Sequence, residues 1–250
     1  MRILIAAFIT CLTLPFSNTE TLNQPEQEAN ISGAWRMISE DGVEAPQTSI
    51  LLLMDGYLFI TDYSMDKKHF EGSIGAVYQQ QGDEVNYDIE FSTYDTDMVG
   101  DKVNTKVRIE GNQMFWKQNF NGKDSDFVFE RVDNGVGDLA GAWRITDRMR
   151  NGQMTAMRQG SRKTIKMITG TRFQWAAYDP ATKRFSGTGG GTIELKDGEY
   201  TENIEFFSRN KDRVGVRLTF DYKVDGNKWD HSGMSSSGNP IREIWTRQNQ

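Results

Sequence analysis

The sequence predicts an all-β protein built from two tandem up-and-down antiparallel β-barrels of about eight strands each. Three observations predict this fold class: a repeat of about a hundred residues, short runs in which apolar and polar residues alternate, and turn residues between those runs. Strands joined by tight turns pair with their neighbours, and closing the sheet into a barrel removes its exposed edges. A β-sandwich is the alternative architecture.

The N-terminal segment has the three-part layout of a secretory signal peptide. Met1-Arg2 is a short basic start, 3–16 is an almost unbroken apolar run, and 17–30 is polar. Because the apolar run is too short to span a bilayer, we expect a signal peptide at 1–19 and a polar linker at 20–30. The protein is therefore expected to be exported, either to the periplasm or out of the cell. A buried structural helix is the alternative for the apolar run.

The single cysteine, Cys11, lies inside this apolar run. It does not follow a small residue, so we do not expect it to be a lipoprotein cysteine. Once the signal peptide is removed, the chain can form no disulfide and has no thiol nucleophile. The exported protein must therefore depend on its hydrophobic core, and its length suits one large or two small domains.

The repeat runs along the whole chain after residue 30. The hexapeptide ISGAWR at 31–36 returns as LAGAWR at 139–144. Further matches follow at a constant offset of 115 residues: Phe70 and Gly72 with Phe185 and Gly187, 89–91 with 204–206, Val99-Gly100 with Val214-Gly215, and Gly111-Asn112 with Gly226-Asn227. Matches spread this evenly indicate duplication of a whole domain. We place the first copy at 31–132, a linker at 133–138 and the second copy at 139–248.

Within each copy the pattern is one of short strands and tight turns. Asp55-Gly56 and Asp197-Gly198 are hairpin signals, because these residues accept a positive φ at low cost. The runs 85–91 and 214–220 alternate apolar and polar residues, which predicts half-buried antiparallel strands. No long amphipathic helix is expected in either copy.

The two copies carry opposite net charge. Residues 31–138 contain 9 Lys+Arg against 20 Asp+Glu, whereas residues 139–250 contain 19 against 12. We favour the interpretation that the acidic first barrel packs on the basic second barrel; the alternative is that the second barrel binds an anion. A basic series could serve either purpose or form a solvated face: Arg148, Arg150, Arg158, Arg162, Lys163, Lys166 and Arg172. Nucleic acid is not expected as a partner of an exported protein.

The first and last strands of each copy resemble those of the lipocalins and their calycin relatives. The resemblance rests on a Gly-x-Trp motif in the first strand and an arginine in the last strand. These signature residues are Gly33, Trp35 and Arg131 in the first copy and Gly141, Trp143 and Arg247 in the second. Residues 198–206 also resemble small lipocalin-like domains of uncharacterised function in exported bacterial proteins. The resemblance implies that each arginine packs across its tryptophan at one end of a barrel. It further implies transport or sequestration of a small apolar molecule, although a few members are enzymes.

Comparing the copies with each other points to a site in the second one. On the fifth strand Glu202 stands where the first copy has Tyr87, and on the seventh strand His231 stands where it has Trp116. Because a slip of one residue would expose the whole apolar face, both replacements must point into the barrel. The fourth strand also loses volume: Phe70, Gly72, Ile74 and Ala76 become Phe185, Gly187, Gly189 and Gly191.

Loss of volume and gain of polarity predict a filled first barrel and a partly hollow second one. We expect the small-molecule site to be lined by Tyr200, Glu202, His231, Trp175 and Trp229. A buried carboxylate needs a partner, and His231 is the nearest candidate for Glu202. The alternative for this pair is a structural hydrogen bond at the barrel mouth.

Three functions remain open at this point. The leading hypothesis is an exported binding protein for a small, partly apolar molecule. The second is an isomerase-like or hydrolase-like enzyme that uses Glu202 and His231 as its acid–base pair. The third is a structural or interaction protein with both barrels filled. No cofactor is expected, and no metal site either, because His69 and His231 fall in different copies.

Overall fold

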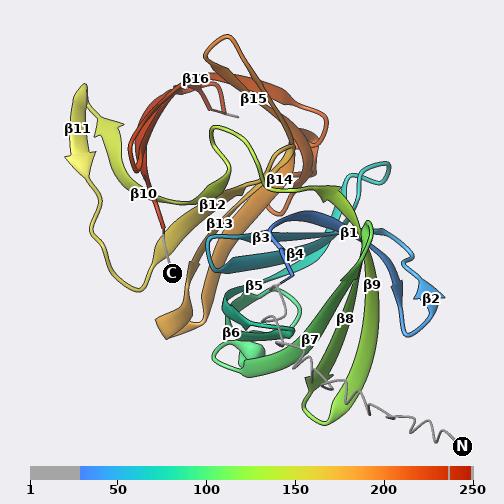
Figure 1. Ribbon diagram of the computed structural model, residues 1–250. Helices are drawn as coiled ribbons and strands as arrows, with labels where there is room; N and C mark the ends of the chain where they lie inside the picture. The colour runs from blue at the N-terminus through green and yellow to red at the C-terminus, as the bar shows by residue number, and fades with distance from the viewer. Residues whose placement is uncertain (1–28, 236, 249–250) are drawn as a thin grey trace, which may run out of the picture.

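The computed structural model describes residues 29–235 and 237–248. The expected signal peptide at 1–19 and the expected linker up to residue 28 lie outside the described residues. Two closed antiparallel barrels stand side by side, each with eight strands (Figure 1). The predicted all-β architecture of two up-and-down barrels is confirmed.

Barrel 1 is formed by the strands between Gly33 and Asp133. They are β1 (Gly33–Glu40), β3 (Thr48–Met54), β4 (Tyr57–Ser64), β5 (His69–Gln81), β6 (Glu84–Ser92), β7 (Lys102–Glu110), β8 (Gln113–Phe120) and β9 (Lys123–Asp133). Each strand pairs with the next, and β1 pairs with β9 to close the barrel. The short β2 (Val43–Glu44) folds back on the end of β1, and a 3₁₀ turn, η1 (Thr96–Met98), precedes β7.

Barrel 2 repeats this order between Gly141 and Arg247. Its strands are β10 (Gly141–Arg150), β12 (Lys163–Ile168), β13 (Arg172–Asp179), β14 (Arg184–Lys196), β15 (Glu199–Phe207), β16 (Arg217–Asp225), β17 (Lys228–Met234) and β18 (Pro240–Arg247), with 3₁₀ turns η2 (Pro180–Thr182) and η3 (Lys211–Arg213). Pairing of β10 with β18 closes the barrel. The hairpin of β10 with β11 (Gln153–Ala156) projects away from the barrel wall (Figure 1).

The tryptophan of each Gly-Ala-Trp motif is fully buried, and the arginine of the last strand covers its ring. The guanidinium carbon of Arg131 lies 3.9 Å from the ring centroid of Trp35, and that of Arg247 lies 4.4 Å from Trp143. Each arginine also donates to a backbone carbonyl before the first strand, such as that of Ser32, at 3.0 Å. A cation over an indole ring combined with these hydrogen bonds ties the last strand of each barrel to its first.

The two barrels pack on each other through apolar outer faces. Their shared cluster contains, among others, Ile50, Leu52, Phe59 and Phe91 of barrel 1 and Ile165, Met167, Ala176 and Phe206 of barrel 2. Two ion pairs cross the contact, Lys163 with Glu90 at 2.5 Å and Arg247 with Asp55 at 3.2 Å. In both pairs barrel 1 supplies the acid and barrel 2 the base, as the charge imbalance led us to expect.

The contact between the barrels is reciprocal. The hydroxyl of Tyr63 donates to Glu205, and the hydroxyl of Tyr178 donates to Glu90. Tyr178 and Glu205 are the positions 115 residues beyond Tyr63 and Glu90, so each barrel contributes the same two residues. Such an interface has the form of an isologous contact about a two-fold axis.

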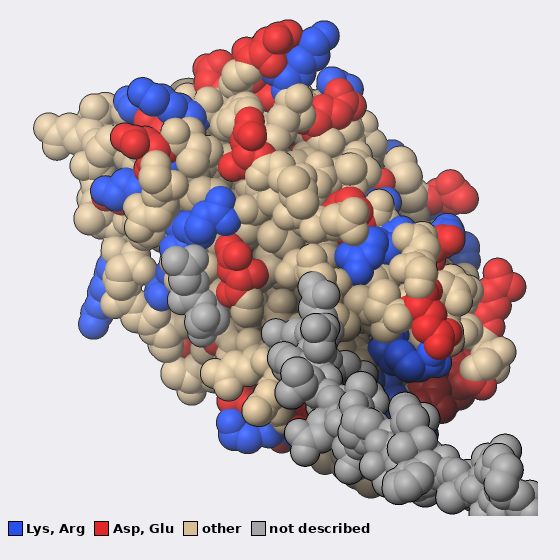
Figure 2. All heavy atoms as spheres, in the orientation of Figure 1, with Lys and Arg blue, Asp and Glu red and all other residues tan. Residues whose placement is uncertain are grey.

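The aromatic rings beside these hydroxyls also contact one another reciprocally. Ring centroids are 4.9 Å apart for Tyr63 and Phe206, and 4.8 Å apart for Phe91 and Tyr178. On the outer surface, by contrast, acidic and basic side chains are interspersed over the face in view, and neither barrel shows a continuous patch of one sign there (Figure 2).

Candidate ligand site in barrel 2

Both barrels enclose a cavity, of about 330 Å³ in barrel 1 and about 350 Å³ in barrel 2. The expectation that barrel 1 is filled and only barrel 2 is hollow is therefore wrong. One reason is that Tyr57 belongs to the cluster between the barrels, so its ring does not fill barrel 1. Tyr87 and Trp116 do point inward, but they line a space instead of occupying all of it.

The glycines of β14 explain the rest of the error. A Cβ atom at Gly189 would lie 2.8 Å from the ring of Phe207 and 3.0 Å from the indole nitrogen of Trp175. A Cβ atom at Gly191 would collide with the backbone carbonyl oxygen of Asn203. Neighbouring rings and backbone thus take up the volume that these glycines release. The loss of side chains from β14 allows close packing and leaves little additional space.

The lining chemistry, in contrast, differs sharply between the two cavities. Barrel 1 is lined mainly by apolar side chains, including Leu58, Ile60, Ile74 and Ile89. In barrel 2 the lining includes two acids, Glu202 and Glu243, and four bases, together with His231. The bases are the buried Lys166 and, nearer the surface, Arg148, Arg162 and Arg209. Polarity, not volume, therefore distinguishes the two barrels.

Glu202 points into barrel 2, as the alternation of β15 predicted, and is 4% exposed. Its carboxylate accepts a hydrogen bond from the Lys166 ammonium at 2.8 Å and one from the Tyr200 hydroxyl at 2.9 Å. The expected pairing with His231 is not the one that forms. Lys166, which the sequence grouped with a basic series on the surface, is buried and neutralises the carboxylate instead.

The Lys166 ammonium lies among aromatic rings. Its distances to the ring centroids of Tyr200, Trp229 and Trp245 are 5.5, 5.2 and 5.1 Å. Aromatic faces attract a cation, and they stabilise it most where water is excluded. The rings and the Glu202 carboxylate together compensate for the burial of this charge.

His231 is buried beside the same cavity, and among the described residues neither of its ring nitrogens has a hydrogen-bond partner. Its ring packs 4.2 Å from the ring centroid of Phe220, and its Nδ1 lies 3.8 Å from Oε2 of Glu243, which is too far for a hydrogen bond. Burial, assisted by the Lys166 charge, lowers the pKa of His231 below its ordinary value of 6.5. The imidazole is therefore neutral at pH 7 and offers one donor and one acceptor.

Glu243 forms a second ion pair at the edge of the cavity. It accepts from Nε and a terminal nitrogen of Arg148 at 3.0 and 2.6 Å, and from the indole nitrogen of Trp245 at 3.1 Å. Burial alone would raise the pKa of this carboxyl. The positive charges of Arg148 and Lys166 outweigh burial and lower the pKa of the Glu243 carboxyl to about 2.

The five residues expected from the sequence thus lie in one region of barrel 2. Glu202, His231 and Trp175 line the cavity. Tyr200 and Trp229 stand behind that lining, where Tyr200 holds Glu202 and the Trp229 ring packs 5.0 Å from the His231 ring. The indole nitrogen of Trp229 is buried without a hydrogen-bond partner, like the nitrogens of His231.

Sequence reasoning missed Glu243, and it named Lys166 and Arg148 only as members of a basic series, not as residues of this site. The signal was available in the duplication, because strand pairing places Lys166 opposite Trp143 as Leu51 is placed opposite Trp35. In the same way the pair Arg148 and Glu243 of β10 and β18 corresponds to Glu40 and Phe127 of β1 and β9. Comparison of the two copies on the first, second and last strands would have assigned all three to the site.

The chain was compared with known proteins. No family model and no curated protein matches it. Among solved structures, transferrin-binding protein B of Neisseria meningitidis serogroup B matches at 12% identity and a TM-score of 0.25, covering 82% of this chain and 59% of that one. A mutant of transferrin-binding protein B from Haemophilus parasuis matches at 9% identity and a TM-score of 0.23, covering 88% and 64%.

This chain therefore spans about three-fifths of the length of those proteins. Because both TM-scores are below 0.5, no function or partner is inferred from them. In the described part of the chain, no helix is long and apolar enough to cross a membrane. The same residues contain no group of three or more His, Cys, Asp or Glu placed to hold a metal ion.

Proposed function

We propose that this protein binds a small, partly apolar molecule in the cavity of barrel 2. The observation that carries the proposal is His231, a buried imidazole that borders the cavity with both ring nitrogens unpaired. An unsatisfied buried polar group costs about 1–3 kcal/mol, and a ligand that hydrogen-bonds to it recovers part of that cost. Cavities of about 300–1,000 Å³ with few polar groups and many apolar ones are typical of small-molecule sites.

The surrounding residues define what such a ligand would meet. Trp175, Phe207, Leu218 and Ile241 provide apolar walls. Glu202 and Glu243 are already paired with bases, so among the buried lining residues His231 is the polar group left to bond to the ligand. The ligand would therefore be mostly apolar, with a hydroxyl, carbonyl or amide placed to meet the imidazole.

The acid–base enzyme hypothesis receives no support from this geometry. It requires Glu202 and His231 to act as a pair, and the two side chains belong to separate interactions. We therefore retain the binding function. We also propose that the protein acts after export, which the N-terminal sequence suggests.

The proposal is tested by mass spectrometry of small molecules extracted from the native protein. Wild type should yield a bound molecule. The variant His231→Phe keeps an aromatic ring against Phe220 but removes the two ring nitrogens that would bond to the ligand. We expect the extracted molecule to be lost or reduced at least tenfold in this variant.

Tyr87→Phe is the matched control. It removes a hydrogen bond to Gln118 inside barrel 1 and should leave the extracted molecule unchanged. The proposal fails if His231→Phe retains the molecule at the wild-type level. It also fails if wild type yields nothing and no compound of a metabolite panel raises its melting temperature.

A further inference from the structure

The connection after the first strand is longer in barrel 2 than in barrel 1. The offset between the copies is 108 residues at Trp35 and Trp143 but 115 residues at Ile50 and Ile165, so barrel 2 carries seven additional residues here. They lengthen a connection that barrel 1 also has: the β10–β11 hairpin and the segment 157–162 correspond to the shorter β1–β2 hairpin and residues 45–47. Neither barrel needs these residues for closure, because β10 pairs with β12 and β18 in the same way as β1 pairs with β3 and β9.

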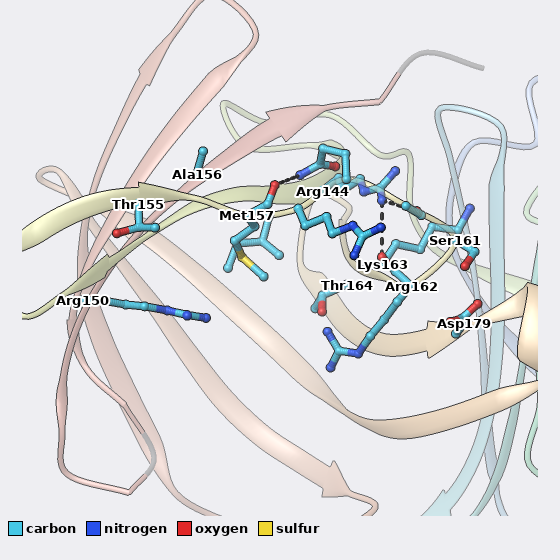
Figure 3. Close-up of a pocket in the computed structure, with 14 residues that line it drawn as sticks. Arg144, Arg150, Thr155, Ala156, Met157, Ser161, Arg162, Lys163, Thr164 and Asp179 are labelled. Atoms are coloured by element: carbon cyan, nitrogen blue, oxygen red, sulfur yellow. Dashed lines mark hydrogen bonds between the residues drawn. The ribbon is translucent and has the colours of Figure 1, made fainter.

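The additional segment forms one wall of a cleft of about 660 Å³, and the start of β12 forms another. Four arginines line this cleft: Arg144, Arg150, Arg158 and Arg162. Figure 3 shows Arg150 reaching in from the hairpin and Arg162 from the segment that leads into β12, with Met157 between them.

The positive charge of the cleft is largely uncompensated. Arg144 donates to the carbonyl oxygens of Gly160 and Arg162, not to a carboxylate. Among the described residues no ion pair is found for Arg150, Arg158 or Arg162. Lys163 also lines the cleft, but Glu90 neutralises it, and Asp179 is the one acidic side chain among the described lining residues. Several guanidinium groups held together in this way repel one another and attract an anion.

The cleft adjoins the cavity of barrel 2. Met157, Arg162 and Thr164 line both of them. A molecule in the cavity can therefore extend past these residues into the cleft. Arginine is the side chain best suited to hold carboxylate or phosphate oxygens there, because its planar fork donates two parallel hydrogen bonds.

We propose that the cleft binds the anionic group of the ligand, so that the ligand is an anionic amphiphile whose apolar part lies in barrel 2. The inference rests on the proposed binding function and adds the class of molecule. The apolar part contacts the walls around Trp175 and Trp245, and the carboxylate or phosphate lies among Arg150, Arg158 and Arg162. Barrel 1 has an apolar cavity of similar size but lacks these arginines, so it does not select such a ligand.

The test uses three probes on the full chain: n-octyl phosphate, n-octanol and inorganic phosphate. Trp175 and Trp245 line the cavity, so tryptophan fluorescence reports its occupancy. We expect octyl phosphate to bind at least tenfold more tightly than octanol, with an affinity that falls as salt rises. The variant R150Q/R158Q/R162Q should abolish this preference by lowering the affinity for octyl phosphate.

A matched control removes the same charge from the outer surface of barrel 2. R184Q/K211Q/R217Q changes three exposed basic residues outside the cleft and should keep the preference for octyl phosphate. The inference is overturned if R150Q/R158Q/R162Q keeps the preference, or if wild type has none. It is also overturned if inorganic phosphate displaces octyl phosphate at equal concentration, which would indicate a site for free anions.

Octanol binding tests the cavity site separately from the assignment of the cleft as the anion site. If octanol binds and the preference for phosphate is absent, the cavity is a ligand site and the assignment of the cleft is wrong. If neither octyl compound changes the tryptophan fluorescence of wild type, both the cavity site and the assignment of the cleft are wrong.

Discussion

Lys166 and Glu202 form an ion pair inside barrel 2, and each side chain is only 6% exposed. Removing one member leaves the other charge buried without a partner. We expect Glu202→Leu to lower the free energy of unfolding by about 3–5 kcal/mol. K166L/E202Y should recover most of that loss, because it replaces both charges by the residues found in barrel 1. Urea unfolding of the three proteins measures the difference; equal stability of the single and double variants would contradict the expectation.

The buried His231 makes stability depend on pH. Its pKa is lowered in the folded state, so below about pH 6.5 the unfolded chain takes up a proton that the folded protein resists. Stability should therefore fall as the pH drops below 6.5, and His231→Phe should flatten this part of the profile. Glu243, with its pKa lowered to about 2, adds a second loss below its ordinary value of 4.5. Urea midpoints between pH 3 and 8 measure both steps, and an unchanged profile in His231→Phe would refute the assignment to this residue.

At the scale of single residues, the sequence predicted where the polar groups lie but not how they pair. Glu202 and His231 stood out because each replaces an aromatic residue of barrel 1 on a strand of known phase. The partner of Glu202 could not be found in that way. Lys166 comes from a different strand, and which side chains meet across a barrel interior depends on stagger and on side-chain direction as well as on the phase of one strand.

At the scale of strands, the glycines of β14 are close-packed against their neighbours. Gly190→Ala would place a Cβ atom 2.6 Å from the carbonyl oxygen of Phe173, and a backbone atom cannot move away cheaply. We expect a loss of about 1–3 kcal/mol in the free energy of unfolding, the usual cost of overpacking. Gly137→Ala is the control, because no heavy atom lies within 4 Å of its Cβ position. Thermal unfolding compares the two variants. Equal melting temperatures would show that β14 can accommodate a Cβ atom at this position without strain.

The same glycines show why the prediction of a filled and a hollow barrel was wrong. Alternation and turn residues predicted the strands and their pairing well, because these features depend on local sequence. Cavity volume depends instead on how closely strands and rings from distant parts of the chain approach one another. Phe207 and Trp175 cover Gly189, and no count of side-chain volumes along β14 alone could reveal that.

At the scale of the whole molecule, the reciprocal tyrosines join the two barrels. Tyr63→Phe and Tyr178→Phe each remove one hydroxyl that donates to a glutamate of the other barrel. The glutamates keep their bases, Arg172 for Glu205 and Lys163 for Glu90, so each variant should lose about 1–2 kcal/mol. The two losses should add, because they arise at separate contacts. Calorimetry of both single variants and the double variant measures the free energy of unfolding. A double variant that is no less stable than either single variant would contradict the expected additivity.

The duplication was visible in the sequence, and so was the opposite charge of its two halves. The form of the contact was not, since 31–132 and 139–248 could have met through any pair of faces. The contact uses apolar residues on the outer sides of β3, β4, β12 and β13. In the sequence these residues do not differ from other apolar strand residues, so only the structure shows that they pack against each other.

The reciprocal contact also bears on the history of the gene. A surface that binds its own equivalent is what two separate copies of one barrel need to form a symmetric homodimer. If the tandem chain descends from such a dimer, duplication made the pairing permanent and released each copy from having to serve both roles. One interior could then keep its apolar lining while the other acquired Lys166, Glu202, His231 and Glu243. On this view the ancestral barrel had an apolar interior like that of barrel 1. Its outer face carried the apolar residues that both barrels now use at their contact.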